Sequence, residues 1–301
     1  MNEDFAIKVK DLTKSYDTQL AVKGIDLQIR RGEIFALLGP NGAGKTTIIE
    51  ILEGHRNRTS GDVTVLGHDP EHNNPSSRDR LGIVLQDNGV EPYLKVREIL
   101  EQYTGFYENP KPVEEILLIT NLLEQRDSYP KQLSGGQQRR LDFAICLCGD
   151  PDLLFLDEPT TGFDPSARRS AWDLILHLKS LGKTILLTTH YMEEAERLCE
   201  DLVVIDAGRI VSQGPPKKLI DDHIASDVIE VHGNAPAIET LLSKIDDCSL
   251  RTVGETVYLT EDHRFGRFYR YTPWAWPDWS SGTLEAMVVD GEGSVSWVEV
   301  A

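Results

Sequence analysis

The sequence predicts an α/β fold built around a largely parallel β-sheet. Three observations lead to this prediction: short apolar runs alternate with stretches of helical period, a glycine-rich loop joins a buried strand to a helix, and a second buried strand ends in two carboxylates. The chain has 301 residues, of which 40% are apolar and 27% charged. That length is sufficient for one large α/β domain and a smaller appendage.

The first third of the chain is predicted to consist mainly of strands. Two segments alternate apolar and polar residues between turns, and the continuous apolar run from Ile34 to Leu38 is typical of a strand buried on both faces. The strands are expected over residues 5–9, 20–29, 34–38, 61–66 and 83–85, with a helix over residues 46–54.

In the middle of the chain the apolar period becomes helical. From Lys95 to Leu123 apolar residues recur every three or four positions, and Pro110 and Pro112 divide the run. Short apolar strands then alternate with helices, which predicts parallel strands covered by helices. We expect strands over residues 153–156, 184–188 and 202–205, and helices over residues 138–147, 167–181 and 193–199.

Composition and charge exclude several classes of protein. The net charge of −18 disfavours binding to nucleic acid, whose phosphates require a basic surface. No apolar run reaches the roughly 18 residues of a membrane helix, and Glu3 and Asp4 stand where a signal peptide carries positive charge. We therefore expect a cytosolic chain with any membrane role supplied by a partner. The cysteines fit neither a zinc spacing nor a disulfide framework, and Cys146 and Cys148 are expected to be buried.

A glycine-rich loop after residue 38 carries the strongest chemical signal. It fits G-x-x-x-x-G-K-[ST], and its place between a buried strand and a helix is the one that this phosphate-binding motif requires. Glycines let backbone N–H groups turn toward phosphate oxygens, and the helix that follows directs its positive dipole end at them. Lys45 is expected to reach the β- and γ-phosphates of a nucleotide, and the Thr46 hydroxyl to bind Mg²⁺. The loop consists of Gly39, Pro40, Asn41, Gly42, Ala43, Gly44, Lys45, Thr46 and Thr47.

Two adjacent carboxylates follow the buried strand over residues 153–156. Ligand sites of open α/β sheets lie at this end of a strand. Asp157 is expected to hold the Mg²⁺ shell, and Glu158 to act as the general base that polarises an attacking water. The preference of helix N-termini for acidic residues is an alternative explanation, but it accounts for only one of the two carboxylates.

A second glycine-containing loop distinguishes this chain from other phosphate-binding-loop proteins. Leu133 is followed by a serine, two glycines and a glutamine directly before a helical run, which predicts a second phosphate cradle at a helix N-terminus. One nucleotide needs two such cradles only when another molecule supplies one of them, so a head-to-tail dimer is expected. A serine-capped helix without a ligand is the alternative. The cradle residues are Ser134, Gly135, Gly136 and Gln137.

Together these elements resemble the nucleotide-binding subunit of the ABC transporter family, in the family's order and spacing, over roughly residues 5–220. The resemblance implies a P-loop NTPase cassette: a RecA-like parallel sheet core, an N-terminal antiparallel β subdomain and a helical subdomain at about residues 87–145. It implies an ATPase domain over residues 1–220 and a small α+β extension over residues 221–301, in which strands are expected over residues 228–231 and 257–260 after a short helix over residues 217–223. ATP and Mg²⁺ are the implied cofactors.

Further site residues follow only from the resemblance. Tyr16 resembles the aromatic residue that stacks on adenine, and Gln86 the glutamine that contacts Mg²⁺ and the attacking water and links to the membrane partner. Asp164 matches a loop that communicates across the dimer, in which Phe163 replaces the usual leucine. His190 matches the switch histidine that contacts the γ-phosphate and orients the catalytic glutamate.

The resemblance also indicates the biological role. Residues 188–196 and 88–107 are similar to ATPases of drug, lipid or polysaccharide exporters, whose membrane domain is a separate polypeptide. We therefore expect a second cassette, an integral-membrane permease and a location at the cytoplasmic face of the cell membrane. A homodimer of cassettes is favoured, with a pair of different cassettes as the alternative. Importers share the catalytic motifs, and the cargo is not written in this sequence. A non-transport ABC ATPase or a nucleotide-dependent regulatory module is the alternative, and Glu158 argues against the latter.

The end of the chain departs from the family pattern. From Arg264 to Trp279 the composition changes abruptly, and three arginines are interleaved with aromatic residues. The interpretations left open are a loosely packed tail, an exposed patch that docks a partner or membrane, and a shifted reading frame. The aromatic residues are Phe265, Phe268, Tyr269, Tyr271, Trp274, Trp276 and Trp279.

Overall fold

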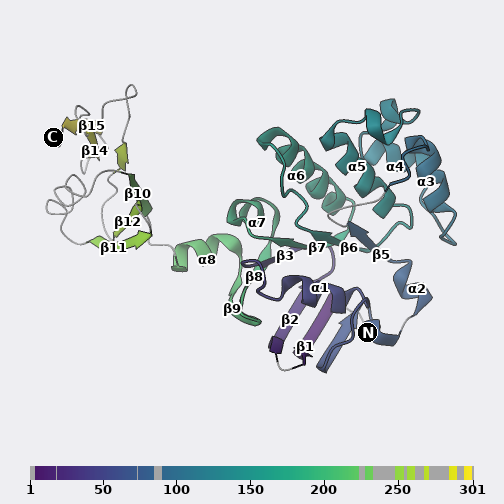
Figure 1. Cartoon of the computed structure of the whole chain (residues 1–301), viewed down its shortest axis with the longest axis horizontal. Coiled ribbons are helices and arrows are strands. Elements are labelled where there is room, and N and C mark those ends of the chain that lie inside the picture. The colour runs from purple at the N-terminus through teal and green to yellow at the C-terminus, as the bar shows by residue number, and fades with distance from the viewer. Residues whose placement is uncertain are drawn as a thin grey trace. The chain divides into compact units, whose positions relative to one another are not determined.

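The computed structural model describes residues 4–17, 19–72, 74–84 and 90–223, and the strand residues 228–232, 248–253, 256–261, 268–270, 285–289 and 295–299 (Figure 1). The chain divides into two compact units, Met1–Lys217 and Lys218–Ala301. Every candidate site residue belongs to the first unit.

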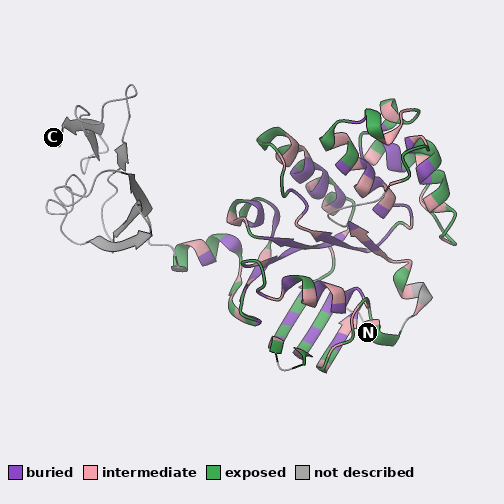
Figure 2. Cartoon of the chain, viewed as in Figure 1, coloured by how far each residue is buried: buried purple, intermediate pink, exposed green. Residues whose placement is uncertain are grey.

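A six-stranded sheet forms the centre of the first unit. Its order is β5-β6-β7-β3-β8-β9, and neighbouring strands are parallel except for β8 and β9. Burial is nearly continuous along β3, β6 and β7 (Figure 2), as apolar runs predict for strands covered on both faces. The predicted α/β fold with a largely parallel sheet is confirmed. The strands are β3 (Ile34–Leu38), β5 (Leu81–Val84), β6 (Leu153–Asp157), β7 (Thr184–Thr189), β8 (Asp201–Asp206) and β9 (Arg209–Gly214).

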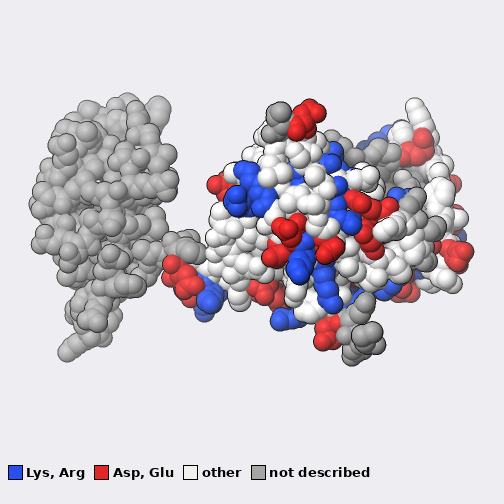
Figure 3. Space-filling model, turned by 90° about the horizontal axis from the view of Figure 1, so that it is seen from below, with Lys and Arg blue, Asp and Glu red and all other residues white. Residues whose placement is uncertain are grey.

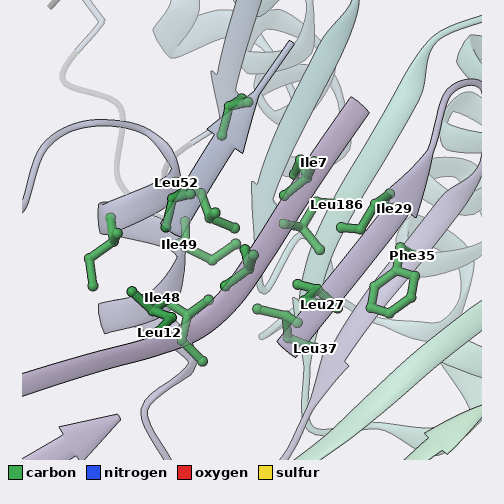
Figure 4. Close-up of a cluster of buried hydrophobic side chains, with 14 of the residues drawn as sticks. Ile7, Leu12, Leu27, Ile29, Phe35, Leu37, Ile48, Ile49, Leu52 and Leu186 are labelled. Carbon is green, nitrogen blue, oxygen red and sulfur yellow. The ribbon is translucent and has the colours of Figure 1, made fainter. Parts of the chain in front are cut away.

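An antiparallel sheet of order β2-β1-β4 lies on one side of the first unit, with helix α1 (Lys45–Leu52) between it and the six-stranded sheet (Figure 1). Its strands are β1 (Phe5–Tyr16), β2 (Gln19–Arg30) and β4 (Ser60–Val65). Side chains from α1 and from both sheets form one hydrophobic core (Figure 4). Because α1 is packed on two faces, the loop before it has a fixed base. The core residues labelled in Figure 4 are Ile7, Leu12, Leu27, Ile29, Phe35, Leu37, Ile48, Ile49, Leu52 and Leu186.

Helices cover the other face of the six-stranded sheet (Figure 1). Helix α5 contacts β5 and α6, and helix α7 contacts β3 and β7. The helices between β5 and β6 are α3 (Val96–Thr104), α4 (Val113–Ile119), η2 (Leu123–Gln125), η3 (Pro130–Gln132) and α5 (Gly135–Cys146). The remaining ones are η1 (Pro70–His72), α2 (Pro75–Arg78), α6 (Pro165–Ser180), α7 (Met192–Leu198) and α8 (Pro216–His223).

The second unit contains two three-stranded antiparallel sheets, of order β10-β12-β11 and β13-β14-β15. The strands predicted near residues 228 and 257 are present, and β11 and β13–β15 were not predicted. Most of the aromatic-rich segment lies outside the described residues. The strands are β10 (Val228–His232), β11 (Cys248–Val253), β12 (Thr256–Glu261), β13 (Phe268–Arg270), β14 (Glu285–Val289) and β15 (Val295–Glu299).

Acidic and basic side chains are interspersed on the face of the first unit drawn in Figure 3. One ion-pair network ties three loops together: Asp150 lies 3.1 Å from the Lys111 ammonium and 2.7 Å from that of Lys183. Burial opposes ionisation of Asp150, but hydrogen bonds from the two lysines outweigh it and lower its pKa. The network joins the segments that precede α4, β6 and β7.

Cys146 and Cys148 are buried, as predicted, and Cys199 is buried too. Burial raises the pKa of all three thiols, that of Cys148 to about 12. Deeply buried thiols with raised pKa values remain protonated at neutral pH. They therefore act as small apolar side chains.

Several element boundaries were predicted wrongly, and the largest difference is in strand β1, which ends at Tyr16 instead of residue 9. Helix α5 begins at Gly135 instead of residue 138, because Ser134 caps it and the glycines form its first turn. Helix α6 begins at Pro165 instead of residue 167, because Asp164 caps it. Strand β9 and the short helices around residues 70–78 were not predicted.

Candidate nucleotide site

The glycine-rich loop leaves β3 and curls around the Lys45 side chain. Lys45 is 6% exposed, and its ammonium donates hydrogen bonds to the carbonyl oxygens of Gly39 (2.8 Å) and Pro40 (3.1 Å). The Ala43 N–H closes the loop by donating to the Pro40 carbonyl at 3.2 Å. Gly44 caps α1 in the left-handed region, with φ 108°. This arrangement places a cation at the centre of the loop and the α1 N-terminus beside it, which suits polyphosphate.

A backbone contact that supports this loop was not predicted from the sequence. Gly208, in the turn between β8 and β9, donates its N–H to the Ala43 carbonyl (2.9 Å) and accepts the Lys23 N–H (2.9 Å). A Cβ atom at Gly208 would lie 2.4 Å from the carbonyl oxygen of Ala21. The only signal in the sequence was an Ala-Gly pair typical of a turn, with no indication that the turn supports the loop.

The two carboxylates at the end of β6 are fixed by β7. The Thr188 hydroxyl donates to Asp157 Oδ1 at 2.5 Å and accepts the Glu158 N–H at 2.9 Å. Glu158 has φ 43°, a left-handed conformation that is costly for a residue with a Cβ atom. The adjacent side chains therefore separate, with Asp157 continuing the strand and Glu158 at the start of a turn. Thr188 is a second residue that sequence interpretation missed, because the contact spans thirty-one positions.

Glu158 and His190 form a pair. His190 Nδ1 lies 3.4 Å from Glu158 Oε1, and the Thr161 hydroxyl donates to Glu158 Oε2 at 2.9 Å. The His190 ring lies against that of Tyr191, with ring centroids 3.9 Å apart and an interplanar angle of 42°. A carboxylate held by a hydroxyl and an imidazole can accept a proton from water while the imidazole contacts a developing charge.

Strand register brings the three motifs to one edge of the sheet. Leu38, the last residue before the loop, pairs with Thr189 in the parallel ladder, and Asp157 pairs with Thr188. The glycine-rich loop, the carboxylates and His190 therefore all leave the carboxyl ends of adjacent strands. Sites of open α/β sheets lie at this edge.

The second predicted cradle lies on a different surface. Ser134 caps α5 by accepting the Gln137 N–H (3.3 Å), and the Gln137 side chain accepts the Ser134 N–H (2.9 Å). Asp164 caps α6, and hydrogen bonds from the Ala167 and Ser166 amides lower its pKa. A hollow of about 600 Å³ adjoins both caps. Its lining includes Ser134, Gly135, Gly136, Gln137, Arg140 and Asp164.

The family follows from comparison with known proteins. A model described as ABC transporter matches residues 22–161. The Nod factor export ATP-binding protein I of Cupriavidus metallidurans is 41% identical over 259 residues, which cover 84% of this chain and 85% of the relative. The chain belongs to the ABC transporter family. The protein of the same name from Ralstonia nicotianae is 42% identical over 258 residues, covering 84% of this chain and 80% of that protein.

Solved ABC cassettes share the fold. One from Clostridium perfringens, part of the ABC transporter complex cbiONQ, has a TM-score of 0.65 and 28% identity, covering 80% of this chain and 100% of that chain. An ATP-binding cassette solved as a dimer with ADP and Pi has a TM-score of 0.61 and 27% identity, covering 70% of this chain and 98% of that chain. The predicted P-loop NTPase cassette is confirmed, and the chain is an ATP-binding, ATP-hydrolysing subunit of an ABC transporter.

Two further residues were predicted for the nucleotide site of this ABC ATPase, Tyr16 and Gln86. The Tyr16 ring is 36% exposed, and the side-chain cations of Lys14 and Arg56 lie 5.1 and 5.2 Å from its centroid. Such cations hold the ring by cation–π attraction and leave part of it open to a ligand. Gln86 lies outside the described residues.

The donors available for Mg²⁺ in this ABC ATPase are oxygen atoms. The Thr46 side chain is exposed at the start of α1, and Asp157 is half-buried at the end of β6. Among the described residues no group of three or more His, Cys, Asp or Glu side chains could hold a metal ion. Mg²⁺ commonly takes one or two protein oxygens together with substrate phosphates and water, so this donor set fits the ion only when nucleotide is bound.

Proposed function

We propose that two copies of this ATPase close head to tail on two MgATP molecules and, through a separate integral-membrane permease, drive the export of a cargo. The observation that carries the catalytic part is the 3.4 Å pair of Glu158 and His190 at the sheet edge where the phosphate-binding loop begins. A base, a switch histidine and a phosphate cradle on one edge are the parts that water-driven phosphoryl transfer needs.

Each residue then has a distinct role. Lys45 and backbone N–H groups of the glycine-rich loop hold the β- and γ-phosphates. Glu158 orients the attacking water and accepts its proton, and His190 contacts the γ-phosphate and keeps Glu158 in place. Thr46, Asp157 and Gln86 would hold Mg²⁺, which neutralises phosphate charge when it is bound. Tyr16 stacks on adenine.

The dimer is proposed because one cassette carries two separate candidate phosphate-binding surfaces, the glycine-rich loop and the loop at Ser134. In a head-to-tail pair, each nucleotide would contact one of these surfaces from each copy. The hollow beside Ser134 and Asp164 lies at the N-terminus of α5, where the backbone amides of Gly135 and Gly136 suit the γ-phosphate of a nucleotide held by another copy. A cassette of the same fold has been solved as a dimer with ADP and Pi, which supports this arrangement.

The permease and the direction of transport rest on further observations. Among the described residues no helix is long and apolar enough to cross a membrane, so translocation is assigned to a partner at whose cytoplasmic face the ATPase binds. We place the contact near residues 86–107, where Tyr93 is 81% and Phe106 72% exposed. The relatives are named as export proteins, which favours export.

The test is the oligomeric state of purified Glu158→Gln, measured by light scattering with and without MgATP. We expect a dimer that forms only with MgATP and an ATPase rate lowered by roughly 10²-fold or more, because the phosphate cradles remain and the base is lost. Lys45→Ala is the matched control and should neither bind ATP nor dimerise. A Glu158→Gln variant that hydrolyses ATP at the wild-type rate would refute the catalytic role, and an ATP-bound monomer would refute self-pairing.

A further inference from the structure

A second carboxylate lies just behind the catalytic pair. Glu194 is 1% exposed, and its Oε1 accepts two hydrogen bonds, from the Thr160 hydroxyl at 2.8 Å and from the Trp172 indole N–H at 3.0 Å. Both donors are neutral and also buried. Burial of a carboxylate is costly unless it is well hydrogen-bonded, so its presence requires a physical account.

The position of Glu194 in its helix explains how the carboxylate is tolerated. Glu194 is the third residue of α7, where the helix dipole favours negative charge. A glutamate at this position commonly bonds back to the N–H of its own helix cap. Here the Tyr191 N–H is already bonded to the Thr189 hydroxyl at 3.0 Å, and Glu194 instead reaches another segment.

That segment carries the proposed base. Thr160 comes two residues after Glu158, whose left-handed backbone (φ 43°) must be held by its surroundings. Thr160 is completely buried, and its carbonyl accepts the Phe163 N–H at 3.2 Å, closing the same turn. On the other side, Glu194 comes four residues after His190. The Thr160–Glu194 bond therefore joins the turn that bears the base to the helix that follows the switch histidine.

Two further contacts fix this junction. Trp172 belongs to α6, so its bond to Glu194 attaches a third element. Arg139 of α5 donates from Nε to the Pro159 carbonyl at 3.3 Å, holding the same turn from the helix that begins at Ser134. The turn after β6 is thus held on both sides, and Glu194 is the member that connects it to His190.

We propose that Glu194 is a positioning residue that sets the spacing of Glu158 and His190 by anchoring Thr160 to α7. This inference rests on the proposed roles of those two residues. Glu194 is buried and acts through the turn and the helix, without contacting nucleotide or water itself. An anchor of this kind affects ATP hydrolysis more than ATP binding, because Lys45 and the loop before α1 follow a different strand, β3.

The test compares four variants by steady-state ATPase kinetics and by binding of a fluorescent ATP analogue. Glu194→Ala should lower kcat about 10- to 100-fold, since a displacement of about 1 Å can cost a factor of 10². KM and the Kd of the analogue should change by less than about twofold. Thr160→Val, which removes only the hydroxyl, should show the same pattern. Glu194→Gln retains an oxygen that accepts both bonds and should keep kcat within about threefold of wild type. The double variant Glu194→Ala/Thr160→Val should lose no more activity than the worse single variant.

Controls separate this inference from the proposed function. Glu193→Ala removes the neighbouring exposed carboxylate and should leave kcat unchanged. Thermal melts identify variants that do not fold. If Glu194→Ala does not fold, Thr160→Val and Trp172→Phe replace it in the test. Three results would each overturn the proposed anchor. They are an unchanged kcat in folded Glu194→Ala and Thr160→Val, losses of kcat that add in the double variant, and changes in KM as large as those in kcat. Wild-type activity in Glu158→Gln would instead remove the proposed base and leave the cause of any Glu194 effect to be assigned elsewhere.

Discussion

At the scale of single residues, Glu53 shows how strongly the core can alter a side chain. Glu53 follows α1 and is 7% exposed, with its Oε2 3.1 Å from His55 Nδ1. Burial, followed by the nearby charges of Asp157 and Glu50, raises its pKa to about 8. Glu53 is therefore mostly protonated at neutral pH in the folded protein. In the unfolded chain its pKa has the ordinary value of 4.5, so the carboxyl is ionised above about pH 4.5.

This shift makes stability depend on pH. A raised pKa in the folded state means that the unfolded chain releases this proton first, so the free energy of unfolding falls as pH rises from about 4.5 to about 8. Glu53→Gln removes the titrating group and should be more stable than wild type at pH 8.5, by more than about 1 kcal/mol, with little difference at pH 4.5. Urea unfolding of both proteins without nucleotide measures this. The same substitution at the exposed Glu193 should give no such trend, and parallel pH profiles for wild type and Glu53→Gln would contradict the raised pKa.

At the scale of elements, sequence patterns located the strands that matter most. The runs that became β3, β6 and β7 are continuous and apolar because both faces of each strand are covered. The phosphate-binding loop is likewise local, since its glycines, lysine and helix start lie within nine consecutive residues. Patterns of this kind reflect only near neighbours in the chain.

The contacts that complete the site could not be predicted in this way. Thr188 bonds Asp157 across thirty-one positions, Glu194 bonds Thr160 across thirty-four, and Gly208 braces Ala43 from the end of another strand. Each depends on which strands become neighbours, and β9, whose hairpin contains Gly208, was itself missed. Its alternating burial is that of an edge strand and is weak as a sequence signal.

The turn between β8 and β9 makes a prediction about the loop that it supports. Gly208 has φ 80°, and a methyl group there would meet the Ala21 carbonyl, so Gly208→Ala should lower stability by about 2–4 kcal/mol and raise the KM for ATP. Gly182→Ala is the matched control: Gly182 has φ 83° but no atom within 4 Å of an added Cβ. It should cost only about 1 kcal/mol and leave the KM unchanged. Denaturant unfolding and ATPase titration report both quantities, and equal effects of the two variants would show that the close approach is unimportant.

At the scale of the whole molecule, the site is contained in one unit. The phosphate-binding loop, the Glu158–His190 pair and the cap at Ser134 all lie within Met1–Lys217, and no described strand after α8 joins a sheet of that unit. The division after Lys217 is a property of the fold. That residues 221–301 form a functional extension stays a prediction, as do the interpretations of the aromatic-rich segment.

This division predicts the result of removing the second unit. A chain ending at His223, which keeps α8 whole, should fold, bind ATP with an affinity within about threefold of the full chain and melt within a few degrees of the first unit in the intact protein. The reason is that the described hydrophobic core is built by side chains of α1 and of the two sheets of the first unit. Calorimetry and binding of a fluorescent ATP analogue to both chains measure this, with the Lys45→Ala form of the shorter chain as the control for specific binding. A short chain that folds but no longer binds ATP would mean that residues after 223 contribute to the nucleotide site.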